Sequence, residues 1–222
     1  MQIALSYTLQ FALETLGAVD FLKALGQGLS LIIKGDNDFY SQRKELQKRG
    51  LPLTRAGLQV LDAHANAHCQ ISEVHKTGLG SSAAMMTSLV GALLSFFDLC
   101  ALDSEGGKRI THNLAQFCHC FAQGKVGSGF DVSAAVYGSH LYRRFSPEIL
   151  KPFLEKAEKG QLTGKDLVAL VVDKEWDAQV QPCDIPRGIR LVLGEVDTGS
   201  NTPSMVSKVL QWKSKNPQIG AF

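Results

Sequence analysis

A glycine-rich turn leads directly into a long helical segment that carries no charge before Asp98. The turn reads KTGLGSSAA over residues 76–84, and the helix is expected over residues 83–99. A helical segment without charged side chains is expected to be deeply buried. A strand is expected immediately before the turn, at residues 69–74, so the pattern predicts a strand–turn–helix element.

A turn of this composition ahead of a helix can bind an anion. Glycine lets the backbone approach oxygen atoms that a Cβ would exclude, and the first N–H groups of the helix attract negative charge. Ser81 and Ser82 add hydroxyl groups for a phosphate or for magnesium, a hard cation that prefers oxygen ligands. The alternative is structural: one serine caps the helix, and the glycines form a turn.

Two common nucleotide-binding fingerprints are excluded by their context. Gly78, Gly80 and Ala83 fit the dinucleotide pattern G-x-G-x-x-A, which requires a second strand ending in an acidic residue about 20 positions later. Asp98 has this offset, but it ends an expected helix and another helix follows. A Walker A loop is excluded because no lysine follows the last glycine. A phosphate site of another kind remains.

A second glycine cluster, GSGFD at residues 127–131, also precedes a helix of small residues. An aspartate at this place often only caps its helix. Asp131 could also face the phosphates bound by the first turn, where it would hold magnesium or accept a proton.

The rest of the chain predicts an α+β fold in one compact unit without repeats. Gly17 is expected to end the first helix, and Ser104 and Gly124 are expected to cap the helix between them. The small-residue helix after residue 131 should lead into a strand that ends in two arginines. Further helices are expected at residues 3–16, 41–49, 58–63 and 204–213, and further strands at 28–35, 167–172 and 189–193.

Composition excludes several classes of function. The 222 residues have a formal net charge of +2 at pH 7, which favours neither nucleic acid binding nor a membrane surface. Gln10 and Glu14 interrupt the apolar N-terminal stretch, which indicates a core helix and neither a signal peptide nor a membrane span. The five cysteines are scattered without disulfide spacing, so a reducing compartment and a cytoplasmic location are expected.

A zinc site in the helix before Gly124 is excluded by geometry. His112, Cys118, His119 and Cys120 are suitable ligand types, but residues two positions apart on a helix point about 200° apart. Cys118 and Cys120 therefore cannot share a tetrahedral ion. We expect Cys118 in the core and His119 on a solvated face.

KTGLGSSAA together with GKVGSGFDVSAAVYGSHLYRRF resembles the galactokinase–homoserine kinase–mevalonate kinase–phosphomevalonate kinase (GHMP) superfamily. The longer second run points to the plant and fungal branch whose acceptor is 5-phosphomevalonate. NDFYSQR (37–43), GLPLT (50–54) and TGSNTPSMV (198–206) are similar to the same branch, so the resemblance covers essentially the whole chain.

The resemblance implies transfer of the ATP γ-phosphoryl group to the phosphate of 5-phosphomevalonate, in the mevalonate pathway of isoprenoid and sterol synthesis. It implies Mg²⁺ with ATP as co-substrate, the small molecules ATP and 5-phosphomevalonate as partners, Asp131 as the catalytic aspartate and Ser82 as a magnesium ligand. The ATP phosphates would be bound by Lys76, Gly78, Leu79, Gly80, Ser81, Ser82, Ala83 and Ala84. The acceptor would be bound by Ser128, Gly129, Arg143, Arg144, Thr198, Ser200 and Thr202.

The acceptor determines which charges such a site needs. A phosphate monoester has its second pKa near about 6 and is mostly a dianion at neutral pH, so a general base contributes less than it does for an alcohol. Bringing two polyanions together requires magnesium and cationic side chains. Lys76, Lys125, Arg143 and Arg144 flank the two glycine clusters, and Lys125, beside the GSGFD turn, is the candidate for a catalytic cation.

The resemblance also implies a longer enzyme. Members of the superfamily begin with a strand-rich segment that carries an adenine-side motif and a lysine, and they end with a glycine-rich motif. We therefore expect residues 1–222 to form a single incomplete kinase domain. The alternative is a catalytically inactive remnant that binds anions or another protein. Cys120 stands eleven residues before Asp131, where some members have a glutamate that binds magnesium.

Overall fold

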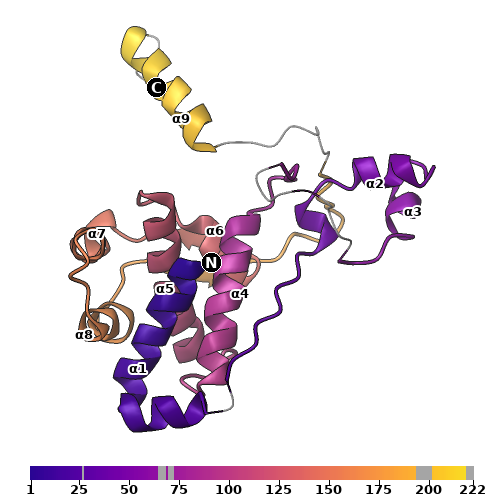
Figure 1. The fold of residues 1–222 in the computed structure, drawn as a ribbon. Helices are drawn as coiled ribbons and strands as arrows, with labels where there is room; N and C mark the ends of the chain where they lie inside the picture. Colours follow the sequence, from indigo (N-terminus) through magenta and orange to yellow (C-terminus); the bar gives the residue numbers. More distant parts are fainter. Residues whose placement is uncertain (27, 65–68, 70–72, 194–201, 219–222) are drawn as a thin grey trace. The chain divides into compact units, whose positions relative to one another are not determined.

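The computed structural model describes residues 1–26, 28–64, 69, 73–193 and 202–218, with the backbone alone for 202–206. The described part is mostly helical with one two-stranded antiparallel sheet (Figure 1), so the predicted α+β class is confirmed. The elements are α1 (Gln2–Ala24), η1 (Asn37–Phe39), α2 (Arg43–Lys48), α3 (Arg55–Leu58), α4 (Ser81–Phe96), α5 (Glu105–Gln123), α6 (Phe130–Tyr137), β1 (His140–Arg143), η2 (Pro147–Ile149), α7 (Lys151–Glu158), α8 (Gly164–Val168), η3 (Ala169–Asp173), β2 (Gln179–Pro182) and α9 (Thr202–Lys215).

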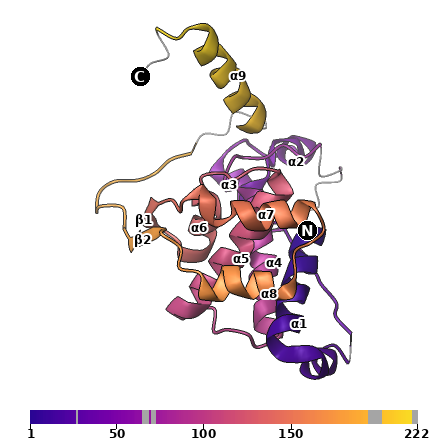
Figure 2. The same ribbon diagram turned by 90° about the vertical axis from the view of Figure 1, so that its left-hand side faces the viewer.

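The chain divides into two compact units, of which the first comprises residues 1–32 and 82–191 and the second residues 33–81 and 192–222. In the first unit, α1, α4 and α5 lie side by side (Figures 1 and 2) and supply most of one hydrophobic core. Tyr7 of α1 packs edge-on against Phe117 of α5, with ring centroids 5.2 Å apart. The expected single domain over the whole chain stays a prediction.

Helix α5 is buried along most of its length. Its expected caps are confirmed: Ser104 accepts a hydrogen bond from the Gly107 N–H, and Gly124 ends the helix in the left-handed conformation (φ 63°). Every residue from 111 to 120 is buried, including polar ones that would face solvent if only one face were covered. The reason is that α1 and α7 pack on this helix and so do α6 and η3.

The first helix continues beyond its expected end. Gly17 breaks the regular geometry (φ 76°, ψ 161°), as glycine can, but the chain resumes the helix as far as Ala24. The helix expected at residues 58–63 is wrong: α3 spans Arg55–Leu58, because the Thr54 side chain accepts a hydrogen bond from the Gly57 N–H and sets its start. Helices α2, α4 and α9 begin and end close to their predicted bounds.

Three predicted strands are wrong, and half of a fourth lies outside the described residues. The segment at 167–172 is α8 and η3, because Leu167, Leu170 and Val171 have helical spacing and are fully buried. Residues 28–35 and 189–193 are irregular in the described part of the chain, where no strand pairs with them. Apolar β-branched residues form a strand only when a neighbour satisfies their backbone groups. Residues 70–72 of the strand expected at 69–74 are not described.

The predicted strand after α6 is confirmed as β1. It pairs antiparallel with β2, with His140 opposite Pro182 and Arg143 opposite Gln179. Successive side chains on a strand alternate between faces, so Tyr142 and Arg143 lie on opposite sides of this small sheet.

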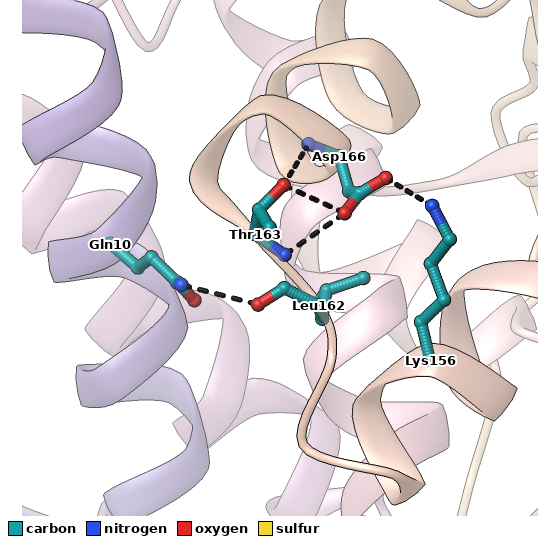
Figure 3. A network of polar contacts seen from close by, with 5 residues as sticks. All are labelled: Gln10, Lys156, Leu162, Thr163 and Asp166. Carbon is teal, nitrogen blue, oxygen red and sulfur yellow. Dashed lines mark hydrogen bonds and ion pairs between the residues drawn. The ribbon is translucent and has the colours of Figure 1, made fainter.

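A polar network joins α1, α7 and α8 (Figure 3). Thr163 and Asp166 form a capping box in which the Asp166 N–H donates to Thr163 Oγ1 (3.2 Å) and the Thr163 N–H donates to Asp166 Oδ2 (3.0 Å). Lys156 Nζ donates to Asp166 Oδ1 at 2.5 Å, and Gln10 Nε2 donates to the Leu162 carbonyl at 3.4 Å. These contacts fix the start of α8 against its neighbours.

The hydrogen bond from Lys156, with those from Thr163, lowers the pKa of Asp166 from 3.8 to about 2. Because the folded-state pKa lies below the unfolded one, the stabilisation from Asp166 is complete above about pH 4 and is lost as the pH falls towards 2. Asp166→Asn should therefore lower the urea midpoint of unfolding at pH 7. The difference from the wild type should shrink between about pH 4 and pH 2.

The matched control is Glu158→Gln, which removes an exposed carboxylate at the end of α7. This variant should keep the wild-type midpoint at both pH values. An Asp166→Asn difference that is the same at pH 7 and pH 3 would show that the charge of Asp166 contributes nothing to stability.

Candidate active site

The first glycine turn is held at its start by the segment that precedes α2. Tyr40 and Lys76 form an antiparallel bridge. The Thr77 N–H donates to the Phe39 carbonyl (3.2 Å), and Thr77 Oγ1 donates to the Asp38 carbonyl (2.7 Å). This pairing anchors the chain one residue before the glycines.

The glycines of this turn adopt a conformation that other residues rarely adopt. Gly78 and Gly80 have φ values of 88° and 77°, in the left-handed region that glycine enters at little cost. The chain then enters α4 at Ser81. Asp98, which follows α4, leads into a loop and then α5, as expected from the exclusion of a dinucleotide-binding fold.

The two serines at the start of α4 differ in exposure. Ser81 is buried, whereas Ser82 is exposed. Ser82 Oγ lies 3.4 Å from Nε2 of His119 on α5. The Ser82 hydroxyl therefore interacts with a second helix while it remains accessible to a ligand.

The second glycine turn places Asp131 inside α6 and not at its cap. Gly129, in the left-handed conformation (φ 77°), occupies the N-cap position, and Asp131 lies in the first turn of the helix. Its Oδ1 accepts a hydrogen bond from the Val132 N–H (2.9 Å), and its side chain is 28% exposed. The structural alternative for Asp131, an N-cap, is therefore wrong. The second carboxylate oxygen, Oδ2, takes no part in the hydrogen bond with the Val132 N–H.

Strand β1 and the residue after it hold the second turn in place. The Tyr142 hydroxyl donates to the Ser128 carbonyl (3.2 Å), and an Arg144 guanidinium N–H donates to the Gly127 carbonyl (2.9 Å). Burial raises the pKa of Tyr142 to about 12, so at neutral pH the phenol keeps its proton and can donate it in this bond. Tyr142 is a site residue that the sequence did not single out.

There is no room for a side chain at Gly129. A Cβ there would lie 2.6 Å from Gln116 Oε1, 2.9 Å from the Phe145 ring and 3.0 Å from the Tyr142 hydroxyl. Both the backbone angle and the packing therefore require glycine, which explains this position of the motif.

Polar side chains from three helices meet at one imidazole nitrogen. His119 Nε2 of α5 lies 3.4 Å from Ser82 Oγ of α4 and 3.9 Å from Asp131 Oδ2 of α6. The same nitrogen lies 3.4 Å from Gln123 Nε2. His119 is 8% exposed, so the expected solvated face is wrong; burial lowers its pKa, partly offset by the Asp131 carboxylate.

These residue types are those of a nucleophilic triad, but the geometry differs. In a triad the histidine faces the serine with one ring nitrogen and the carboxylate with the other, so that it can accept the serine proton while the carboxylate orients the ring. Here Ser82 and Asp131 both face Nε2 of His119. The arrangement suits fixing two polar groups beside a ligand, and it does not suit activating Ser82 as a nucleophile.

The predicted cations have different surroundings. Lys125 is exposed and begins the segment that leads into the second turn, and its backbone N–H donates to the Cys120 carbonyl (3.2 Å). Arg144 is bound to the turn itself, whereas Arg143, on the face of β1 opposite Tyr142, is exposed. Lys76 is exposed beside the first turn, in the other unit.

The predicted acceptor residues near the C-terminus are Thr198, Ser200 and Thr202. Thr198 and Ser200 lie outside the described residues, and Thr202 begins α9 with only its backbone described. Their predicted role stays a prediction.

The oxygen atoms of this site fit a hard cation. The exposed hydroxyl of Ser82 and the partly exposed carboxylate of Asp131 are the ligand types that magnesium prefers. Cys118 is buried as expected, and burial raises its pKa. In the described part of the chain, no group of three or more His, Cys, Asp or Glu side chains could hold a metal ion.

None of the helices in the described residues has both the length and the apolar character needed to cross a membrane.

Comparison with known proteins places these turns in a family. Residues 47–139 match the family described as GHMP kinases N terminal domain, a span that contains both glycine turns and α4, α5 and α6. No solved structure matches the chain significantly.

Curated relatives match most of the chain. It is 47% identical to Phosphomevalonate kinase ERG8 of Gibberella zeae over 85% of this chain and 41% of that protein. It is 43% identical to Phosphomevalonate kinase erg8 of Aspergillus fumigatus, over 94% of this chain and 42% of that protein. The peroxisomal phosphomevalonate kinase of Arabidopsis thaliana is 43% identical over 88% of this chain and 42% of its own length. The chain thus spans about two fifths of these relatives. Residues 47–139 are thus similar to GHMP kinase N-terminal domains, and the chain over most of its length is similar to the phosphomevalonate kinases.

Proposed function

We propose that this protein transfers the γ-phosphoryl group of ATP to the phosphate of 5-phosphomevalonate, giving 5-diphosphomevalonate and ADP. The observation that carries the proposal is the meeting of Ser82 and Asp131 at His119, with each residue directly after a glycine turn. The names of the relatives supply the acceptor. The product would enter isoprenoid and sterol synthesis.

In the proposed reaction an oxygen of the acceptor phosphate attacks the γ-phosphorus of ATP. The bond from that phosphorus to the bridging oxygen breaks, and its electron pair leaves with ADP. The acceptor is mostly a dianion at neutral pH, so few acceptor molecules need to lose a proton first. Asp131 would accept that proton from the monoanionic fraction and would orient the attacking oxygen. Charge neutralisation and orientation are the larger task.

The donor phosphates would be bound at the first turn and the start of α4, by Lys76 and residues 78–84. Backbone N–H groups at the start of a helix suit this role because they point along a favourable dipole. Ser82 and Asp131 would hold magnesium, which when bound neutralises charge on the β- and γ-phosphates. Ser82 is the more accessible of the two serines, which supports its place among the ligands.

The acceptor phosphate would be bound near the second turn. Lys125 is exposed beside that turn and would neutralise charge between the two phosphates. Ser128, Gly129 and Arg143 would contact the acceptor together with the loop that contains Thr198, Ser200 and Thr202. Arg144 already donates to the Gly127 carbonyl, so it would support the acceptor site by holding the shape of the second turn.

A cytoplasmic location is proposed on the scattered, unpaired cysteines. One plant relative is named as peroxisomal. Expression of the tagged chain in its own cells, with cytosolic and peroxisomal markers, distinguishes the two locations.

ADP release from Mg-ATP by the purified chain, with and without 5-phosphomevalonate, tests the proposed function. Acceptor-dependent ADP release is expected. Mevalonate, which lacks the acceptor phosphate, serves as the matched substrate control and should give no release above background. A folded chain that releases no acceptor-dependent ADP would contradict the proposal and favour an inactive remnant that only binds anions.

Ser82→Ala should raise the magnesium concentration needed for half-maximal activity by about 10–100-fold, since an oxygen contact to a charged group contributes about 1.5–3 kcal/mol. The reason is that the exposed hydroxyl is the proposed ligand. Ser88→Ala removes an exposed hydroxyl from the same helix, where it donates to the Met85 carbonyl, and should leave the requirement unchanged. An unchanged requirement in Ser82→Ala would move the ligand role to Ser81.

A further inference from the structure

The imidazole of His119 lies beside the first turns of both α4 and α6. It is almost fully buried, and its Nε2 lies 3.4 Å from Ser82 Oγ and 3.9 Å from Asp131 Oδ2. It belongs to α5, a helix on which α1, α6, α7 and η3 all pack. A rigid, buried helix is a suitable base for fixing two groups that must act together.

The partners of Nε2 determine which ring nitrogen carries the proton. The Asp131 carboxylate can only accept a hydrogen bond, so a lone pair on Nε2 would face negative charge. The Ser82 hydroxyl can present an oxygen lone pair to an N–H group. The nearest atom of Gln123 is its amide nitrogen, which can only donate, but Gln123 is exposed and its amide can turn away from the ring. The Asp131 carboxylate, together with the Ser82 hydroxyl, therefore favours the neutral tautomer that carries its hydrogen on Nε2.

This tautomer sets the direction of the Ser82 hydroxyl. When the His119 Nε2–H donates to Ser82 Oγ, the hydroxyl hydrogen is left to donate to a phosphate oxygen, and one oxygen lone pair is left for a cation. In the opposite tautomer the Ser82 hydroxyl would donate to Nε2 and lose its donor for the ligand. The ring nitrogen that carries the proton thus decides what Ser82 can offer.

We propose that His119, with its proton on Nε2, is a positioning residue that holds the Ser82 hydroxyl and the Asp131 carboxylate in one arrangement across α4, α5 and α6. The inference rests on the proposed phosphoryl transfer. His119 does not touch the substrates: it acts through Ser82 on the donor phosphates and through Asp131 on the acceptor.

Two substitutions separate positioning from packing. His119→Gln keeps an N–H donor at a similar reach along the side chain, whereas His119→Leu fills the space without a donor. His119→Leu should lower kcat by about 10–100-fold, the usual loss when a residue that orients a site is removed. The KM values for ATP and 5-phosphomevalonate should change by less than about threefold, because uniform binding is kept.

His119→Gln should recover most of the lost kcat, and both variants should unfold near the wild-type urea midpoint. Packing alone predicts a different result: the two variants would have equal kcat values, or the loss would follow the unfolding midpoint. Either result, or a wild-type kcat in His119→Leu, overturns the proposal.

The ¹⁵N spectrum of the imidazole tests the arrangement without any catalysis. Chain labelled at histidine, compared with His119→Gln to assign the signal, should show the proton of His119 on Nε2. A proton on Nδ1 overturns the proposal. This measurement also separates the two hypotheses: if the wild-type chain releases no acceptor-dependent ADP, the proposed function fails, while the spectrum still decides the arrangement of His119.

Discussion

Asp131→Asn is expected to lower kcat for acceptor-dependent ADP release by about 10²-fold, the lower end of what a positioned acid or base contributes. The KM for ATP should change by less than about threefold, because the substitution leaves the first glycine turn and α4 unaltered. The amide has nearly the shape of the carboxylate, so the local helix start should persist.

The physical reason lies in the place of the carboxylate. One oxygen of Asp131 accepts the Val132 N–H, while the other faces Nε2 of His119. An amide cannot accept a proton, and it is a weaker partner for magnesium than a charged carboxylate. The loss is expected to be smaller than for an enzyme with an alcohol acceptor, because the acceptor phosphate is already mostly deprotonated.

The control for this prediction is Asp103→Asn, which removes an exposed carboxylate from the loop before α5. It should keep the wild-type kcat and KM. A wild-type kcat in Asp131→Asn would remove Asp131 from the site. A raised KM for ATP with an unchanged kcat would instead assign Asp131 to donor binding.

Gly129→Ala is expected to destabilise the chain and to abolish measurable turnover. Alanine in the left-handed conformation costs about 1–2 kcal/mol, and forcing a Cβ into filled space costs about 1–3 kcal/mol more. The Cβ would lie 2.6 Å from Gln116 Oε1, whose side chain is fully buried and cannot move out into solvent. Turnover should fall because the same turn places Asp131 and carries the Ser128 carbonyl that Tyr142 binds.

The chain offers a close control two residues earlier in the same turn. Gly127 lacks a positive φ, and a Cβ there would meet nothing within 4 Å. Gly127→Ala should therefore unfold within about 1 kcal/mol of the wild type, and the loss of backbone freedom in the unfolded chain could even stabilise it.

Urea unfolding followed by circular dichroism measures both variants. With an m value of about 1–3 kcal/mol per molar urea, the midpoint of Gly129→Ala should fall by about 1 M or more. Equal midpoints for the two variants would show that the second turn rearranges to admit a Cβ, and that its shape is not what holds Asp131.

Features encoded within a few neighbouring residues were predictable from the sequence. Ser104 and Gly124 cap α5 as expected, because a hydroxyl three residues before an N–H and a glycine after the last turn act locally. The same holds for the left-handed glycines of the two turns and for the helices that follow them.

Features that depend on residues far away in the sequence were not predictable from the sequence. The segment at 167–172 has the composition of a strand, yet it is helical because Leu167, Leu170 and Val171 bury one helical face in the core of the first unit. Residues 28–35 have a similar composition and are irregular, with Ile32 82% exposed. Whether such a run becomes a strand depends on a pairing partner, which the run itself does not specify.

The residues of the candidate site divide in the same way, into those that the sequence predicts and those that depend on the packing of distant residues. By itself the sequence determined the two glycine turns, the helices that follow them, and the family that these motifs resemble, since each depends on local backbone preference and on residue types at fixed spacing. Only the tertiary structure decided that His119 is buried, that it meets Ser82 and Asp131, and that Tyr142 holds the second turn. These residues come from different helices and a strand, and side chains far apart in sequence are brought together only when the whole core packs.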